Sequence, residues 1–214
     1  MFLVVNPRAG GGRGQAAFRS IRPLLRAGDH IAFTADTGDA RRMAAQAARA
    51  GHELVVALGG DGTVNEVVNG IAEASFAPVL GIVPAGRAND LAYSLRLPRD
   101  PVAALNLLRC GSHRPLDVDL VNIENRRERL FVNILGMGVS GEIAAMTRQK
   151  GGRPVFISYA FPLLVRMVRA RPLRFQVSVR DAVVVRAALA AHLANGRREG
   201  GLFRVAPDAE TDDG

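Results

Sequence analysis

The stretch Leu54-Val55-Val56-Ala57-Leu58, followed by Gly59-Gly60-Asp61-Gly62-Thr63, decides the fold of this chain. The first five residues form the short, β-branched run that is typical of a buried parallel strand. Thr63 and Glu66 match a capping box, which predicts that a helix begins at Thr63. After the glycines, apolar residues recur at helical spacing, at Val64, Val67, Val68 and Ile71.

A glycine-rich turn between a strand and a helix favours an anionic ligand. Glycine lets the backbone approach the ligand closely, and the free N–H groups at a helix start attract phosphate. Asp61 adds a carboxylate, which would repel a bare phosphate. It is better explained by Mg²⁺ or by a hydroxyl group that donates to it. The loop therefore predicts a site for phosphate and metal.

The composition is that of a globular protein with a basic surface. The chain has 214 residues, 48% of them hydrophobic, a mean hydropathy of +0.10 and a net charge of +8, which comes almost entirely from arginine. Its single cysteine, Cys110, excludes an internal disulfide and fits a reducing compartment. The N-terminus shows no secretory signal, and the longest apolar stretch, Val155 to Val165, is about half a bilayer span. We expect a cytoplasmic protein.

The N-terminal half alternates strands and helices, which predicts a parallel sheet covered by helices. Ligands of such sheets bind at the carboxyl ends of the strands, where the polar motifs of this half also lie. The expected strands are Phe2–Asn6, His30–Thr34, Leu54–Leu58 and Pro78–Val83. The expected helices are Arg13–Ala27, Asp39–Ala50, Thr63–Ala74, Ala88–Leu95 and Pro101–Arg109.

From about Leu116 the pattern changes to longer strands of the antiparallel type. We place a domain boundary near Gly111–Pro115, which gives an α/β nucleotide-binding domain at 1–113 and a β-rich domain at 114–214. The expected strands are Leu116–Ile123, Leu130–Leu135, Leu173–Arg180 and Ala182–Ala194, and the expected helices are Ser140–Gln149 and Phe156–Arg169.

Several motifs have both a functional and a structural interpretation. Gly10 to Gly14 is a flexible turn or a phosphate-proximal loop, although Gly12, Gly14 and Ala17 match G-x-G-x-x-A only weakly. Thr34 is a ligand contact or a turn hydroxyl. The segment Gly86 to Asp90 binds a ligand or caps a helix through Asn89 or Asp90. Asp117 and Asp119 share one strand face, where carboxylates are usually solvated.

Other site chemistries are not supported by the sequence. The four histidines show no metal-ligand spacing, and one cysteine cannot build a zinc site. The chain has neither a G-x-S-x-G elbow nor a Walker G-x-x-x-x-G-K-[ST] motif, so a nucleotide would not be held by a P-loop lysine. Nucleic-acid binding is disfavoured by the 5% aromatic content and by the lack of a recognisable motif.

Three N-terminal motifs resemble the diacylglycerol kinase catalytic family, which includes bacterial lipid kinases and sphingosine kinases. They are Asn6-Pro7 with its glycines, Gly59 to Glu66, and Pro84 to Asp90. The resemblance continues in family order through the second half. It is carried there by Leu116-Asp117, Phe131-Val132-Asn133 with Gly136 and Gly138, Asn195-Gly196-Arg197, and Gly200 to Ala209.

The resemblance implies ATP as phosphoryl donor, Mg²⁺ as metal and a lipid hydroxyl as acceptor, in a cleft between a Rossmann-like domain and an incomplete antiparallel β-sandwich-like domain. Asp61 would be catalytic. The metal would be held by Asp61, Asp90 and Asp117, with Asp213 at a second, structural ion. The nucleotide contacts would be Asn6, Thr34, Gly59, Gly60, Asp61, Gly62, Thr63, Val64, Asn65, Gly86, Arg87 and Asn89.

Two positions depart from the family pattern. Arg87 stands where the family usually has threonine, so arginine would either grip the nucleotide phosphates or block their usual pose. Gly214 stands where relatives continue for about a third of their length, in the part that carries the general base. We therefore expect a C-terminally truncated chain whose kinase activity is weak or absent. A fusion that restores the tail should regain it.

The resemblance also implies a peripheral location on the inner face of the cell membrane. Phe156 to Val165, with Arg166, Arg169, Arg171 and Arg174, is either a basic surface segment that contacts anionic lipid or an ordinary core helix. The sequence does not decide whether the lipid acceptor is diacylglycerol or a sphingosine-like alcohol. It also does not decide whether the chain forms a homodimer. The alternatives are an NAD-kinase-like enzyme with a soluble substrate and a non-catalytic nucleotide- or lipid-binding module.

Overall fold

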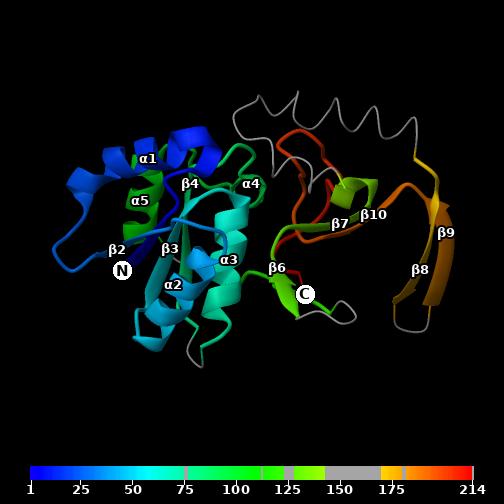
Figure 1. The fold of residues 1–214 in the computed structure, drawn as a ribbon, viewed down its shortest axis with the longest axis horizontal. Coiled ribbons are helices and arrows are strands. Elements are labelled where there is room, and N and C mark those ends of the chain that lie inside the picture. The colour runs from blue at the N-terminus through cyan, green and yellow to red at the C-terminus, as the bar shows by residue number, and fades with distance from the viewer. Residues whose placement is uncertain (75–76, 112, 123–127, 143–169, 180–181, 214) are drawn as a thin grey trace.

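The computed structural model describes residues 1–74, 77–111, 113–122, 128–142, 170–179 and 182–213. Its N-terminal part is a four-stranded parallel sheet in the order β2-β1-β3-β4, covered by helices (Figure 1). The strands are β1 (Phe2–Val5), β2 (His30–Phe33), β3 (Leu54–Gly59) and β4 (Val79–Pro84). The helices are α1 (Ala9–Ile21), the 3-10 turn η1 (Arg22–Leu24), α2 (Asp39–Arg49), α3 (Asp61–Ile71), α4 (Asp90–Ser94) and α5 (Pro101–Cys110).

Side chains that alternate along the strands bury the sheet on both faces. Val4, Ala57 and Ile82 pack in one cluster with α2 and α3. Leu3, Val56, Leu58 and Val83 pack in a second cluster with α1 and α5. Because β1, β3 and β4 are covered on both faces, they are continuous apolar runs, which is why the sequence predicted the parallel sheet correctly. The α/β class is confirmed.

Helix α3 begins at Asp61, two residues before the predicted start at Thr63. The residue that precedes it, Gly60, is extended (φ −100°, ψ −174°) and has no side chain to cap the helix. Thr63 lies inside the first turn, where its hydroxyl accepts a hydrogen bond from Asn6 and does not cap the helix. The capping-box prediction was therefore wrong, because the Thr63 hydroxyl bonds to Asn6 and not to the backbone at the helix start. The predicted apolar stripe of this helix is buried.

The glycine run at the start of α1 has non-helical backbone angles. Gly10, Gly11 and Gly12 all have positive φ, so regular helical geometry begins at the predicted Arg13. A Cβ on Gly10 would lie 2.5 Å from the carbonyl oxygen of Ala85, which shows a close packing of this turn against the loop after β4. The helix ends at Ile21 and not at the predicted Ala27, since Pro23 removes a backbone donor in the next turn.

Helices α4 and α5 follow β4. The predicted Ala88–Leu95 helix is shortened to α4, because Asn89 adopts a left-handed conformation (φ 51°, ψ 49°) immediately before it. Helix α5 begins at the predicted Pro101, and the side chain of Asp100 caps it by accepting from the Ala103 amide. The helix ends at the exposed Cys110.

The C-terminal part consists of antiparallel strand pairs, as the sequence predicted, but with shorter strands. The predicted strand Leu130–Leu135 is divided at Val132 and Asn133, and the predicted strand Ala182–Ala194 is divided at Leu189. The pairs are β5 (Asp119–Val121) with β6 (Arg129–Phe131), β7 (Ile134–Gly138) with β10 (Ala190–Ala194), and β8 (Leu173–Val179) with β9 (Ala182–Ala188).

Two predicted helices involve residues outside the described ranges. Residues 139–142 are helical, which agrees with the beginning of the predicted Ser140–Gln149 helix. The rest of that helix, the whole of Phe156–Arg169 and the apolar part of the predicted membrane segment lie outside the described residues.

Helix α3 is joined to strand β6 by one side chain. The side-chain nitrogen of Asn69 donates to the carbonyl oxygen of Leu130 (2.9 Å), and its side-chain oxygen accepts from the backbone N–H of Leu130 (3.0 Å). The two bonds imitate a neighbouring strand, so the parallel-sheet part and the antiparallel part contact each other through helix α3.

Candidate functional site

A cleft of about 780 Å³ opens at the carboxyl ends of β1 to β4. This is the edge of the sheet where the sequence placed its polar motifs. Nine of the twelve predicted nucleotide contacts line the cleft: Asn6, Thr34, Gly60, Asp61, Gly62, Thr63, Asn65, Gly86 and Arg87. The other three, Gly59, Val64 and Asn89, do not line it.

Asn6 fixes the side of the cleft formed by β1 and α3. Its backbone N–H donates to the Leu58 carbonyl oxygen (2.9 Å), and its side-chain nitrogen donates to the Thr63 hydroxyl oxygen (3.0 Å). Gly59 makes room for this arrangement, since a Cβ there would lie 2.5 Å from the same hydroxyl. Gly59 therefore leaves room for the Thr63 side chain and does not line the cleft. Val64 is part of the core, with 3% of its surface exposed.

Two glycines form the floor of the cleft by backbone contact. A Cβ on Gly86 would lie 2.4 Å from the Cα of Gly60, so the loop after β3 touches the loop after β4. Asn89 holds the second loop, because its side chain accepts from the Gly86 amide (2.8 Å) and donates to the Gly86 carbonyl (3.2 Å). Asn89 thus fixes the conformation of the loop after β4 without lining the cleft itself.

The start of α3 faces open space. A Cβ added to Gly62 would have no atom within 4 Å, although the residue lines the cleft. The first N–H groups of a helix have no partner within the helix, and Gly60 supplies no side-chain cap. These donors and the positive end of the helix dipole are suited to an anion. Arg8, Arg87 and Arg129 also line the cleft.

Two carboxylates face each other beside this helix start. Burial raises the pKa of Asp61, and the Leu91 amide opposes that rise by donating to its Oδ1 (3.1 Å). Burial, and then the charge of Asp61, raises the pKa of Asp90 to about 6, although Arg198 opposes the shift. Burial therefore disfavours the charged form of both carboxylates, and a bound cation would favour it.

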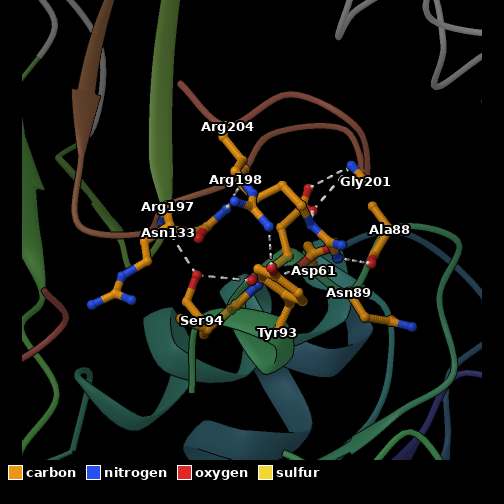
Figure 2. Close-up of polar contacts among 12 residues, drawn as sticks. Asp61, Ala88, Asn89, Tyr93, Ser94, Asn133, Arg197, Arg198, Gly201 and Arg204 are labelled. Atoms are coloured by element: carbon orange, nitrogen blue, oxygen red, sulfur yellow. Dashed lines mark hydrogen bonds and ion pairs between the residues drawn. The ribbon is translucent and has the colours of Figure 1, made fainter. Parts of the chain in front are cut away.

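The pair is completed by a segment that lies more than a hundred residues further along the chain. Arg198 Nε donates to Asp90 Oδ1 (2.8 Å), its Nη2 donates to the Ala88 carbonyl (2.9 Å), and its guanidinium lies 3.9 Å above the Tyr93 ring (Figure 2). The Gly201 amide donates to both carboxylate oxygens of Asp90 (3.0 and 3.2 Å). Asp90 is therefore an anchor between the two parts of the chain.

The four predicted metal ligands do not gather in one place. Within the described ranges, no three carboxylate, histidine or cysteine side chains converge on one point. Asp61 and Asp90 interact, whereas the Asp117 backbone bonds to Thr211 and Asn195, and Asp213 is exposed near the end of the chain. The assignment of Asp117 and Asp213 to metal stays a prediction.

Sequence reasoning missed Arg198, Tyr93 and the Gly201 amide. The chain has 28 basic residues, and nothing in the local pattern around Arg198 distinguishes it from the others. It lies between two segments, Asn195 to Arg197 and Gly200 to Ala209, that were noted for their resemblance to family sequences. A pairing across 108 positions has no periodic signal that a single sequence could show.

Comparison with known proteins agrees with this geometry. The diacylglycerol kinase catalytic domain matches residues 1–121, which include the parallel sheet, most of the residues that line the cleft and both glycine loops. The chain belongs to this family. A "Probable lipid kinase YegS-like" protein of Klebsiella pneumoniae (strain 342) is 34% identical over 190 residues, covering 86% of this chain and 61% of the relative.

Two further proteins support the assignment to the diacylglycerol kinase family. "Probable lipid kinase YegS" of Escherichia coli O17:K52:H18 is 34% identical over 192 residues, covering 86% of this chain and 62% of the relative. The crystal structure of a diacylglycerol kinase from Bacillus anthracis str. Sterne superposes with a TM-score of 0.76 at 28% identity, covering all of this chain and 70% of that one. This chain thus spans about three fifths of the length of these curated relatives.

The similarity to the Bacillus anthracis structure covers the antiparallel part as well as the sheet. Both halves of the predicted fold class are therefore confirmed. Among the helices that the structure describes, none has the length and apolar character needed to cross a bilayer.

Proposed function

We propose that the cleft binds ATP with its phosphates at the start of α3, and that the γ-phosphoryl group passes to a lipid hydroxyl. The contact between Gly60 and Gly86, with open space above Gly62, carries this proposal. It is a cradle built from backbone, and a side chain on any of these glycines would narrow it. Phosphoryl transfer depends mainly on such positioning and on charge neutralisation.

Asp61 and Asp90 fit the role of Mg²⁺ ligands. Mg²⁺ is usually held by one or two carboxylates together with substrate phosphates, so a protein cluster of three ligands is not needed. The raised pKa of both groups shows that burial disfavours their charged forms, which a bound cation would stabilise. When bound, Mg²⁺ neutralises charge on the transferring phosphoryl group. Asp61 and the N–H groups at the start of α3 would orient the phosphates.

The lipid acceptor and peripheral membrane contact are proposals that rest on the relatives, which carry the name "Probable lipid kinase". Diacylglycerol or a sphingosine-like alcohol would supply the hydroxyl. The net charge of +8 favours an anionic membrane surface, where this acceptor would be presented. Weak phosphoryl transfer by this chain, relative to a longer relative, also stays a proposal.

The variant Gly62→Ala tests the nucleotide site without damaging the fold. The new methyl group meets no protein atom and replaces glycine in a helix, so stability should rise by about 0.5 kcal/mol. It would occupy the place of the phosphates, and we expect Mg-ADP affinity to fall at least tenfold, about 1.4 kcal/mol by calorimetry. Gly28→Ala is the matched control, since its Cβ also meets nothing and Gly28 does not line the cleft.

Turnover is tested separately, with radiolabelled ATP and diacylglycerol or sphingosine in mixed micelles. Unchanged Mg-ADP affinity in Gly62→Ala would refute the nucleotide proposal. Tight nucleotide binding with no transfer to any lipid, by this chain or by a fusion to the C-terminal segment of a relative, would instead favour a non-catalytic module. Phosphorylation of NAD that is indifferent to vesicles would favour the NAD-kinase-like alternative.

A further inference from the structure

A second hollow, of about 1070 Å³, lies on the other flank of the loop after β4. It shares only Gly86, Arg87 and Ala88 with the nucleotide cleft. Its walls come from α1, α4, the start of α5 and the segment around residues 197–207. Seven arginines and a single carboxylate, Asp100, line it, whereas the whole chain has 28 basic and 20 acidic residues. The hollow is therefore strongly enriched in positive charge.

Four of these arginines are already engaged with the protein and build the walls. Arg13 donates to the Gly86 carbonyl (3.3 Å) and Arg197 to the Ala209 carbonyl (2.7 Å). Arg204 approaches the Tyr93 hydroxyl (3.4 Å), and Arg198 holds Asp90 as described above (Figure 2). The hollow is thus framed by guanidinium groups held in place by the backbone and by Tyr93.

The other three arginines have no such role. The side chains of Arg87, Arg96 and Arg99 line the hollow without a hydrogen bond or ion pair to any residue that the structure describes. The only carboxylate there, Asp100, accepts from the Ala103 amide and caps α5. Three guanidinium groups therefore face one concave surface without a matching negative charge.

The backbone of Arg96 gives a second, independent indication. Arg96 has φ +57°, the left-handed conformation that usually belongs to glycine at a helix end. The backbone N–H of Arg96 donates to the Tyr93 carbonyl, and the backbone N–H of Leu97 donates to the Ala92 carbonyl. These two hydrogen bonds form a Schellman motif after α4. Glycine would take this position without strain, so the arginine side chain is kept at an energetic cost. Strain of this kind clusters at functional sites.

We propose that this hollow is a binding site for a phosphomonoester, distinct from the nucleotide cleft. Planar guanidinium groups bind phosphate oxygens through paired N–H donors and remain charged at any physiological pH. The volume exceeds what a phosphate alone requires, so the ester carries an organic group. The same chemistry is offered by a soluble phosphate ester and by the headgroup of a phosphatidic-acid-like lipid. The site does not depend on the kinase proposal, because it requires binding and no turnover.

The variant Arg96→Gly is the decisive test, because it removes the guanidinium and relieves the strained backbone. We expect its thermal midpoint to rise by a few degrees and its affinity for glycerol 3-phosphate, measured by calorimetry, to fall at least fivefold. Arg99→Gln should show the same loss of affinity. Arg19→Gln, an exposed arginine of α1 outside the hollow, is the control with an equal loss of charge and should bind like the wild type.

A vesicle experiment separates the two sources of phosphate. Phosphatidylcholine vesicles with and without roughly 20 mol% phosphatidic acid are sedimented with each variant. Loss of glycerol 3-phosphate binding in Arg96→Gly and Arg99→Gln identifies a soluble ester. Loss confined to phosphatidic acid vesicles identifies a lipid headgroup. The proposal is overturned if both variants behave like the wild type in both assays, or if Arg19→Gln loses as much binding as they do. Mg-ADP affinity should be unchanged throughout, since neither Arg96 nor Arg99 lines the cleft.

Discussion

At the scale of single residues, the ion pair between Arg198 and Asp90 joins the two parts of the chain. Both side chains are nearly buried, with 11% and 6% of their surfaces exposed. Replacing Arg198 with methionine would keep apolar contact with Tyr93 but leave the Asp90 charge uncompensated. Breaking a buried pair in this way costs about 3 kcal/mol. We expect that loss in urea denaturation at pH 8.

The double variant Asp90→Asn/Arg198→Met is the control for this effect. It removes both charges, so it should recover most of the stability lost in Arg198→Met. At pH 5 the single variant should lose less than at pH 8, because Asp90 can then take up a proton. Equal losses at both pH values, or no recovery in the double variant, would show that the ion pair is not what joins the two parts.

Asp90 also predicts how stability depends on pH. Its pKa is raised to about 6, so near pH 5 the folded chain binds a proton that the unfolded chain has released. This contribution stabilises the fold below the unfolded pKa of 3.8 and is lost as pH rises through about 6. His52, whose pKa is lowered by burial and by neighbouring charges, acts in the opposite sense over this range. The comparison must therefore be made against Asp90→Asn.

The measurement is the urea midpoint between pH 5 and pH 7.5 for the wild type and for Asp90→Asn. Relative to the variant, the wild type should lose stability as pH rises. Asp61, whose pKa is also raised, adds a contribution of the same sign in both proteins. Parallel curves would mean that Asp90 is already ionised at pH 5. Saturating Mg²⁺ with ADP should flatten the wild-type curve if the carboxylates hold the metal.

At the scale of elements, Asn69 decides how α3 meets the antiparallel part. Asn69→Ala removes two hydrogen bonds to the Leu130 backbone and should destabilise the chain by about 2 kcal/mol. Asn69→Asp should be intermediate, since a carboxylate can still accept from the Leu130 amide but cannot donate. Hydrogen exchange at Leu130 is the direct readout. Unchanged protection of that amide in Asn69→Ala would show that β6 is held by β5 alone.

The same elements show which parts of the fold a sequence can predict. The strands of the parallel sheet were predicted within one or two residues, because burial on both faces gives unbroken apolar runs such as Leu54–Leu58. The start of α3 was predicted too late, since the Thr63 hydroxyl has a partner 57 positions away. In the antiparallel part, the breaks at Asn133 and Leu189 depend on strand pairings that leave no local signal.

The candidate site follows the same division. Most of the glycines and polar residues that line the cleft were predicted, because each lies where a strand of the sheet ends. Gly59 and Val64 were predicted as nucleotide contacts because they belong to the loop motif, but they serve the packing of Thr63 and of the core. Arg96 could not be singled out, since its importance lies in a backbone angle.

At the scale of the whole molecule, we expect the described parts to differ in stability. Strands β8 and β9 pair only with each other within the described ranges, and side chains such as Val183 (60% exposed) remain open to solvent. In Figure 1 this hairpin stands apart from the remainder of the ribbon. A two-stranded hairpin by itself is marginally stable in water. The central strand β3, in contrast, is buried from Val55 to Gly59.

Hydrogen exchange should therefore separate the hairpin from the sheet. Amides of β8 and β9 are expected to exchange at least 10²-fold faster than those of β3, because they open without global unfolding. Amides of β3 should exchange only at the rate set by the global stability. Equal protection in the two regions would show that the hairpin is covered by other parts of the chain in solution.

The loop from Pro84 to Asn89 separates the nucleotide cleft from the hollow, and Gly86, Arg87 and Ala88 line both. Because one loop forms part of the wall of both cavities, a shift of this loop toward one cavity enlarges the other. Occupants of the two sides are then thermodynamically linked: by whatever factor a nucleotide changes the affinity for a phosphate ester, the ester changes the affinity for the nucleotide. Because Arg87 lines both cavities, its positive charge would attract a phosphate group bound in either one.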